Sequence, residues 1–293
     1  MRLIYFGTPD AAVPPLRALV DAGHEVVLVV SGPDRRRGRG SATSPSPVKA
    51  AALELGIPVS ADPADALAVD AELGVVVAFG RMLSDELLAH VPMVNLHFSL
   101  LPRWRGAAPV ERAILAGDAA TGVCVMAVEP TLDTGGIHRR AVVPIDDRIS
   151  ATELRSQLVE VGSALLVEAL SAALGDPEPQ VTDGVTYAAK LTPEDVHLDW
   201  TAPAVDVLRR VRVGGAWTEF RGQRLKVLDA RATPAGGDGA HAAEPGRLDG
   251  VRVACGDGTS VELVTVQPAG KAAMAAADFV NGYRPRPDER LGS

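Results

Sequence analysis

The sequence predicts an α/β protein, with a doubly wound, mostly parallel N-terminal sheet and a smaller C-terminal β domain. Its 293 residues suggest two domains, because one domain commonly takes roughly 150. In the first half, short apolar runs alternate with helix-like stretches, which is the order of a parallel sheet with crossover helices. In the last third, short alternating runs separated by turn residues dominate, and they favour a small antiparallel β-barrel or sandwich.

The first strand and helix are visible in the opening residues. Arg2–Phe6 is an apolar run, and a helix is expected near Ala11–Ala22, where both prolines fall in the first turn. Glu25–Ser31 is the unbroken Val/Leu run of a buried parallel strand. Further strands are predicted at Leu73–Phe79, Met93–His97 and Val123–Val128, and helices near Pro47–Gly56, Ser84–Leu88 and Pro109–Leu115.

A domain boundary is expected after a long helix. Ser150–Glu153 has the form of a capping box, and apolar residues recur at helical spacing from there towards Gly175. Residues 185–203 mix charges without a clear period, so they are predicted to link a first domain (1–184) to a second (204–293). In the second domain a helix is expected at Val205–Val211, and strands at Arg224–Leu228, Arg247–Cys255 and Ser260–Val266.

The composition excludes several classes of protein. Hydrophobic residues make up 47% and charged residues 23%, which suits a packed core and not a disordered chain. No apolar stretch approaches the ~18 residues of a membrane span, and the start shows no signal peptide. Cys124 and Cys255 give neither a disulfide framework nor metal-ligand spacing. We therefore expect a cytoplasmic protein, without a membrane segment or a metal, that is monomeric.

The charge is unevenly distributed. The net charge is −8, but residues 203–293 hold 13 basic against 11 acidic residues. The acidic first part contains one basic cluster, made of Arg35, Arg36, Arg37 and Arg39. Affinity for a polyanion follows the phosphates contacted and not the global charge. The cluster is therefore either a nucleic-acid contact or a solvated loop, and charge alone favours the solvated loop.

The densest chemical signal is the stretch 94–109, VNLHFSLLPRWRGAAP. Asn95 and His97 lie two apart at the end of a predicted strand, so their side chains share one face. Ligands of an open α/β sheet bind beyond the carboxyl ends of its strands. An amide and an imidazole can there stabilise an oxygen that becomes negative in a transition state. By itself, the pair is equally compatible with a structural role.

Two neighbouring segments offer further candidates. Leu100–Pro102 can form a rigid apolar wall for a flat ring, or a loop packed on the core. Asp133 precedes Thr-Gly-Gly, so its plain role is to cap that turn. A role beside His97, orienting it, requires the fold to bring the two together. The glycine-rich dinucleotide motif, the P-loop and the G-x-S-x-G motif are absent from the sequence, which weakens the dehydrogenase, kinase and hydrolase alternatives.

The sequence resembles the methionyl-tRNA formyltransferases, nearly from end to end. Individually some of the matching segments are short, but together and in order they are highly specific. They are FGTPDAAVPPLRAL (6–19), the stretch from GPDRRRGRG to SPSPVK (32–49), NLHFSLLPRWRGAAPVERAILAGDAATGV (95–123), LDTGG (132–136), TYAAKLTPEDVHLDW (186–200) and VQPAGKAAM (266–274).

The resemblance implies a Rossmann-like formyltransferase domain followed by an OB-like barrel that contacts tRNA. The implied reaction transfers the formyl group of 10-formyltetrahydrofolate, a co-substrate, to the α-amino group of methionyl initiator tRNA for translation initiation. Asn95, His97 and Asp133 match the catalytic residues of the family. The segment that lines its folate site is matched by Ser99, Leu100, Leu101 and Pro102. The basic loop that enters the tRNA acceptor stem is matched by Arg35, Arg36, Arg37 and Arg39.

Two alternatives remain. A formyltransferase acting on a small amine, glycinamide ribonucleotide or an amino-sugar nucleotide, would resemble residues 95–136 equally well. The glycinamide enzymes usually lack the C-terminal domain, and the basic loop at 35–39 has no evident use in either. A non-catalytic RNA-binding protein is the second alternative, and the presence of Asn95, His97 and Asp133 counts against it.

Overall fold

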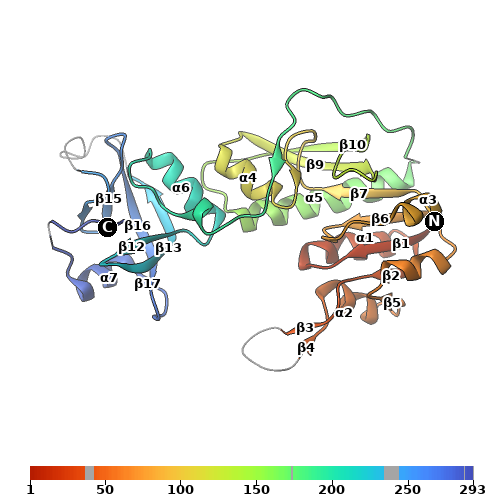
Figure 1. Cartoon of the computed structure of the whole chain (residues 1–293), viewed down its shortest axis with the longest axis horizontal. Coiled ribbons are helices and arrows are strands. Elements are labelled where there is room, and N and C mark those ends of the chain that lie inside the picture. The colour runs from red at the N-terminus through yellow and green to blue at the C-terminus, as the bar shows by residue number, and fades with distance from the viewer. Residues whose placement is uncertain (37–42, 173, 234–243, 287, 293) are drawn as a thin grey trace. The chain divides into compact units, whose positions relative to one another are not determined.

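The computed structural model describes residues 1–36, 43–172, 174–233, 244–286 and 288–292, and Figure 1 shows the chain coloured along its length. The chain divides into two compact units. The first unit consists of Met1–Val110, Ala119–Ile145 and Glu153–Ala189, and the second of Glu111–Asp118, Asp146–Thr152 and Lys190–Ser293. The second unit thus includes two short pieces that lie within the range predicted for the first domain.

A seven-stranded sheet forms the centre of the first unit, in the order β10-β9-β7-β6-β1-β2-β5. Its strands are β1 (Arg2–Gly7), β2 (Glu25–Val30), β5 (Val59–Ser60), β6 (Leu73–Val77), β7 (Met93–His97), β9 (Ala120–Ala127) and β10 (Ile137–Pro144). The five strands from β7 to β5 pair in parallel, and β9 and β10 continue the sheet in antiparallel fashion. This confirms the predicted, mostly parallel sheet.

Helices cover both faces of this sheet, as a doubly wound fold requires. They are η1 (Asp10–Ala12), α1 (Val13–Asp21), α2 (Pro47–Glu54), η2 (Pro63–Ala68), α3 (Asp85–His90), α4 (Pro109–Ala116) and α5 (Ala151–Ser171). The hydroxyls of Ser46 and Ser84 accept hydrogen bonds from backbone N–H groups at the starts of α2 and α3. These side chains satisfy N–H groups that have no partner within the helix.

The pairing register of the strands shows which residues share a face. Phe6 pairs with Val76, and Val76 with Asn95, so these three side chains lie on one side of the sheet. Phe6 packs there in a cluster with buried Leu87 of α3. On the other side, α5 lies against β7, where a Cβ at Gly162 would be 3.2 Å from the Leu96 side chain. Two covered faces hold the end of β7 in place.

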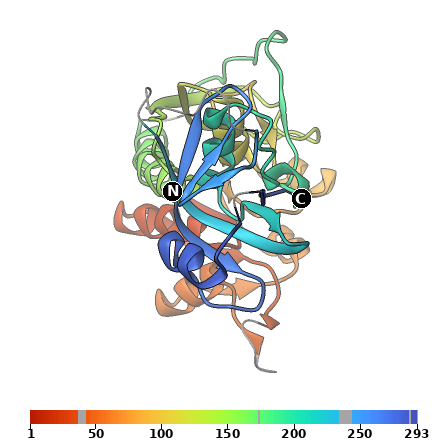
Figure 2. The ribbon, with the colours of Figure 1, turned by 90° about the vertical axis from the view of Figure 1, so that its left-hand side faces the viewer.

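The second unit is built on an antiparallel sheet, whose strands can be followed by colour in Figure 2. The strand order is β12-β13-β16-β15-β14, with β17 paired to β16. These strands are β12 (Trp217–Phe220), β13 (Gln223–Ala232), β14 (Leu248–Asp249), β15 (Arg252–Ala254), β16 (Ser260–Pro268) and β17 (Met274–Ala275). The helices α6 (Ala204–Val213) and α7 (Ala276–Tyr283) contribute buried Val207 and Phe279 to its core.

The antiparallel C-terminal domain is confirmed, whereas its closure into an OB-like barrel is not. Among the described residues, no strand pairing joins β12 to β14, so the barrel stays a prediction. The helix α7 was not predicted, and neither were β10 and β12. The segment 185–203, predicted as a linker, contains the short strand β11 (Tyr187–Ala188) and the helix η3 (Glu194–Val196).

None of the described helices is both long enough and apolar enough to cross a membrane.

Candidate active site

Asn95 and His97 extend from one face of β7, as the alternation of the strand predicts. The His97 side chain is only 7% exposed, and Asn95 is half-buried. Next to His97, in register on β9, lies Cys124. Burial raises the pKa of the Cys124 thiol, so this neighbour is a neutral and unreactive group.

Asp133 reaches this pair from the turn between β9 and β10. Its Oδ1 lies 3.5 Å from Asn95 Nδ2, and its Oδ2 lies 3.8 Å from His97 Nδ1. The fold therefore brings together three polar side chains, the first and last of which are 38 residues apart in the sequence. Both distances are longer than those of strong hydrogen bonds.

Backbone groups after β7 orient both ionisable side chains. His97 Nε2 lies 2.9 Å from the Trp104 carbonyl oxygen, and a carbonyl can only accept, so Nε2 carries a proton. The Nδ1 atom is therefore the ring nitrogen that faces Asp133. The Asp133 carboxylate in turn accepts a 2.7 Å hydrogen bond from Gly106 N–H through Oδ2.

This arrangement depends on unusual backbone conformations. Trp104 and Asp133 have φ values of +64° and +53°, a region that residues other than glycine adopt only where the surroundings hold them. Gly106 has φ +121°, and a Cβ there would lie 2.8 Å from the Ala188 carbonyl oxygen. Only glycine fits at that position, where β8 (Arg105–Gly106) pairs with β11.

The segment matched to a folate site begins two residues after His97. Ser99 is fully buried, and its hydroxyl donates to the Arg103 carbonyl at 2.6 Å. Leu101 is 3% exposed and packs in a small apolar cluster. Leu100 and Pro102 are half-buried. The side chains of Ser99 and Leu101 therefore shape the loop from within, and Leu100 and Pro102 retain exposed surface.

The arginine cluster is only partly described. Arg35 and Arg36 form the short strand β3 (Arg35–Arg36), which pairs with β4 (Thr43–Ser44). Arg37 and Arg39 lie outside the described residues.

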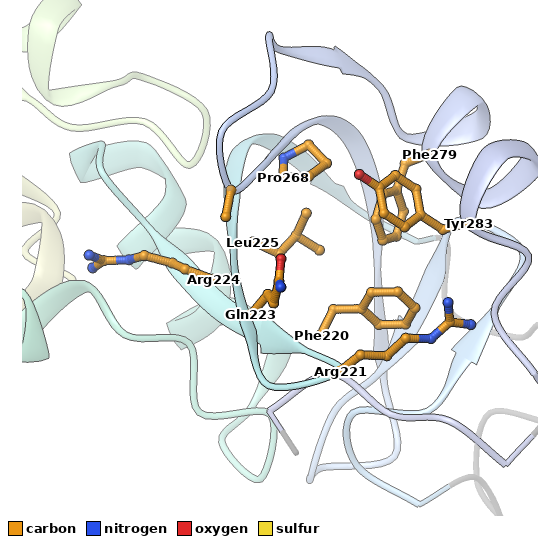
Figure 3. A pocket seen from close by; sticks show the side chains of 9 residues that line it. Phe220, Arg221, Gln223, Arg224, Leu225, Pro268, Phe279 and Tyr283 are labelled. Atoms are coloured by element: carbon orange, nitrogen blue, oxygen red, sulfur yellow. The ribbon is translucent and has the colours of Figure 1, made fainter.

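The second unit contains a pocket that sequence analysis did not predict (Figure 3). It has a volume of about 200 Å³ and is lined by the rings of Phe220, Phe279 and Tyr283. Exposed Arg221 and Arg224 stand at its edge, and the Arg221 guanidinium lies 4.7 Å from the Phe220 ring centre. The Arg221 guanidinium is also paired with Glu289, at 2.8 Å from Nε to Oε1.

Several contacts of the site could not be found from sequence. The Trp104 carbonyl and the Gly106 N–H are backbone groups that no residue type marks. Gln180 contacts the Asp133 turn from a loop 47 positions away, and its sequence context carries no motif. In the described part of the chain, no three His, Cys, Asp or Glu side chains are grouped as metal ligands would be.

Comparisons with known proteins agree on one family. The sequence profile of the family described as formyl transferase matches residues 1–170, and that of the formyl transferase C-terminal domain matches residues 190–284. Methionyl-tRNA formyltransferase from Roseobacter denitrificans is 47% identical, over 96% of this chain and 96% of its own. The protein of the same name from Jannaschia sp. is 46% identical, over 98% of both chains.

Solved structures share the fold at low sequence identity. The N-formyltransferase from Helicobacter canadensis, solved with folinic acid and dTDP-3-aminofucose, has a TM-score of 0.70 at 17% identity. The similarity covers 91% of this chain and 98% of that one. HypX from Aquifex aeolicus, in complex with tetrahydrofolic acid, has a TM-score of 0.67 at 14% identity. The similarity covers 99% of this chain, which spans only half of HypX.

The two family profiles match successive parts of this chain, the N-terminal profile at residues 1–170 and the C-terminal profile at residues 190–284. The relatives at 47% and 46% identity extend the match over almost the whole sequence. The chain therefore belongs to the formyl transferase family, among the methionyl-tRNA formyltransferases.

Proposed function

We propose that this chain transfers the formyl group of 10-formyltetrahydrofolate to the α-amino group of methionyl initiator tRNA. The observation that carries the proposal is the meeting of Asn95, His97 and Asp133 at the end of β7, in a chain whose relatives carry that activity in their names. The same side chains fit a formyl donor, because an amide and an imidazole can donate to a carbonyl oxygen.

Asn95 and His97 would stabilise the oxygen of the formyl group. Attack by the amine places negative charge on that oxygen, and Asn95 Nδ2 can donate a hydrogen bond to it. A protonated His97, with a hydrogen on both ring nitrogens, can donate through Nδ1 while its Nε2 hydrogen is held by the Trp104 carbonyl. Loss of one such donor typically lowers the rate about 10²- to 10³-fold.

Asp133 would balance the charge and receive a proton. An α-amino group has a pKa of about 8 in its free form, so it must lose protons to attack and to complete the transfer. A new bond forms between the amine nitrogen and the formyl carbon, and the bond from that carbon to N10 of the folate breaks. Asp133, directly or through water, would accept the proton that the amine loses, and the folate nitrogen regains one.

The neighbouring segments would bind the two substrates. We assign the folate to the loop Ser99–Pro102, where Leu100 and Pro102 retain exposed surface and Ser99 and Leu101 fix the loop shape. We assign tRNA contacts to the cluster Arg35, Arg36, Arg37 and Arg39 and to the domain of residues 204–293, joined by the linker 185–203 to the catalytic domain of residues 1–184. A monomer acting in the cytoplasm, where translation begins, completes the proposal.

Formyl transfer to two methionine-charged tRNAs, initiator and elongator, tests this function. Transfer from 10-formyltetrahydrofolate to the initiator alone is expected. Both tRNAs carry the same methionine, so only the proposed RNA contacts, outside the site that binds the amine, can distinguish them. Glycinamide ribonucleotide and an amino-sugar nucleotide serve as competing acceptors in the same assay. Transfer to either small amine, with none to the tRNA, would replace the proposal by the alternative.

A further inference from the structure

Gln180 makes four hydrogen bonds next to the candidate active site. Its Nε2 donates to the Asp133 carbonyl at 2.9 Å and to the Gly135 carbonyl at 2.8 Å. Its Oε1 accepts from Arg105, at 3.2 Å from Nε and 2.7 Å from Nη2. The half-buried carboxamide thus uses both of its donor hydrogens and both acceptor positions of its oxygen.

These contacts join the same two segments that meet at the Asp133 carboxylate. On one side is the turn from Asp133 to Gly135, and on the other is the strand β8, where Gly106 N–H donates to Asp133 Oδ2. Gln180 therefore links, through its side chain, the backbone that carries the carboxylate to the strand that orients it.

The Asp133 turn needs such support. Its φ of +53° is adopted by residues other than glycine only where the surroundings determine it. A Cβ at Gly135 would overlap the Ala127 carbonyl oxygen, so the turn has no room to move towards β9. The two carbonyl groups that Gln180 holds are those of Asp133 and Gly135, on either side of Thr134.

We propose that Gln180 is a positioning residue that sets the Asp133 carboxylate against His97 and Asn95. The inference rests on the proposed function, because positioning matters only if Asp133 takes part in the transfer. Gln180 acts through Asp133 and does not itself touch the reacting groups. A glutamine suits this task because its planar amide offers two donor hydrogens and an acceptor oxygen, whereas an ionised glutamate can only accept hydrogen bonds.

Two variants of nearly unchanged volume test the inference. Gln180→Met removes all four hydrogen bonds, and Gln180→Glu turns a negatively charged oxygen towards the two carbonyl groups. The expected result for both is a kcat about 10- to 100-fold lower, with KM for folate and for tRNA within about threefold, since small misplacements of a reacting group cost up to about 10²-fold. A normal kcat in Gln180→Met would overturn the inference.

Glu178→Gln is the matched control. Glu178 lies two residues away in the same loop, and its side chain is 71% exposed and makes an ion pair with Arg140 at 2.6 Å. The substitution removes that surface ion pair and leaves the Gln180 contacts in place, so normal kcat is expected. If Glu178→Gln lowered kcat as much as Gln180→Met does, any perturbation of this loop would lower kcat. The effect would then not be specific to Gln180, and the inference would be wrong.

A double-substitution cycle tests whether Gln180 acts through Asp133 or independently of it. If Gln180 acts through the Asp133 carboxylate, Gln180→Met lowers the single-turnover rate of wild type but adds less than about twofold to the loss in Asp133→Asn. Losses that multiply would assign Gln180 an independent role and overturn the inference. The wild-type rate, measured in parallel, tests the proposed function itself, because an inactive wild type would refute that function before any variant is compared.

Discussion

Replacing Asp133 by asparagine should slow formyl transfer by about three orders of magnitude. The substitution keeps the size of the side chain and removes its charge. It also replaces one acceptor oxygen by an NH2 group, which then faces either Gly106 N–H or the Asn95 amide, both of which donate. The remaining oxygen can satisfy only one of them.

The magnitude follows from the distance between the two ionisable groups. His97 Nδ1 and Asp133 Oδ2 are 3.8 Å apart, and the side chains are 7% and 10% exposed. Unit charges at this separation attract by about 4 kcal/mol at an effective dielectric constant of about 20. In the proposed mechanism a protonated His97 faces the developing oxyanion, and it would lose this stabilisation in the variant. Since about 1.4 kcal/mol changes a rate tenfold, the expected loss is about 10³-fold.

Single-turnover transfer with saturating enzyme and folate measures this loss directly. Folate affinity and the midpoint of thermal unfolding should stay near wild type, because Asp133 contributes little to the core. A single-turnover rate within tenfold of wild type would refute the charge argument and leave Asp133 as a turn residue.

Three further predictions concern packing, thiols and pH. Gly135→Ala should lower kcat by more than about tenfold and should also lower the unfolding midpoint, because the added Cβ would overlap the backbone of β9. Gly282→Ala in α7 is the contrasting substitution, because a Cβ there meets open space. It should raise the free energy of unfolding by up to about 1 kcal/mol. The Cys255 thiol, whose pKa burial raises to about 12, should not react with a disulfide reagent at pH 8 until the protein unfolds. Reaction at the rate of free cysteine would contradict the burial. The pKa of Glu289 is held at about 2, chiefly by Arg221, so the stability that it contributes is present above pH ~4.3 and is lost as the pH falls towards 2. Glu289→Gln should flatten the dependence of the unfolding midpoint on pH in this window, and an unchanged slope would count against the ion pair.

The second unit of the protein should be sensitive to acid. Six carboxyl groups of that unit have a pKa lowered below the ordinary value. They are Asp146, Glu194, Asp195, Asp199, Asp257 and Glu289. A depressed pKa in the folded state means that unfolding takes up protons at low pH, so stability falls as the pH drops. The fluorescence of Trp200 and Trp217 should therefore report loss of structure in this unit as the pH falls below about 4.

Unbroken apolar runs were sufficient to predict four of the five parallel strands, all but the two-residue strand β5, and strand alternation was sufficient to place Asn95 and His97 on one face. Both follow from local rules, because alternation along a strand decides which side chains share a face. The strand β10 was missed because it lies at the sheet edge and carries two arginines and a histidine within IHRRAVVP, which break the apolar pattern. The helix α7 was missed because its short run, AADFVNGY, has too few turns for a period to be visible.

The contacts of the site could be predicted only in part. Residue types identified Asn95, His97 and Asp133 as candidates, but the distance from Asp133 to His97 depends on a turn conformation with positive φ and on hydrogen bonds from distant segments. Gln180 could not be found, since a glutamine in a polar loop has no distinctive local pattern. Its three partner residues, Asp133, Gly135 and Arg105, lie 45 to 75 positions away along the chain, so the contacts exist only in the folded structure.

The pairing of β8 with β11 has a consequence for engineering the two units. Gly106 donates to Asp133 with its own N–H, while the next two backbone N–H groups, of Ala107 and Ala108, donate to the Ala188 carbonyl. The chain that leads to the second unit is thus hydrogen-bonded within two residues of an active-site donor. A chimaera joined at residue 184 would replace that partner, whereas one joined after Ala189 would keep it. The second units of related chains should therefore be exchangeable at the second junction, whereas exchange at the first junction should disrupt catalysis.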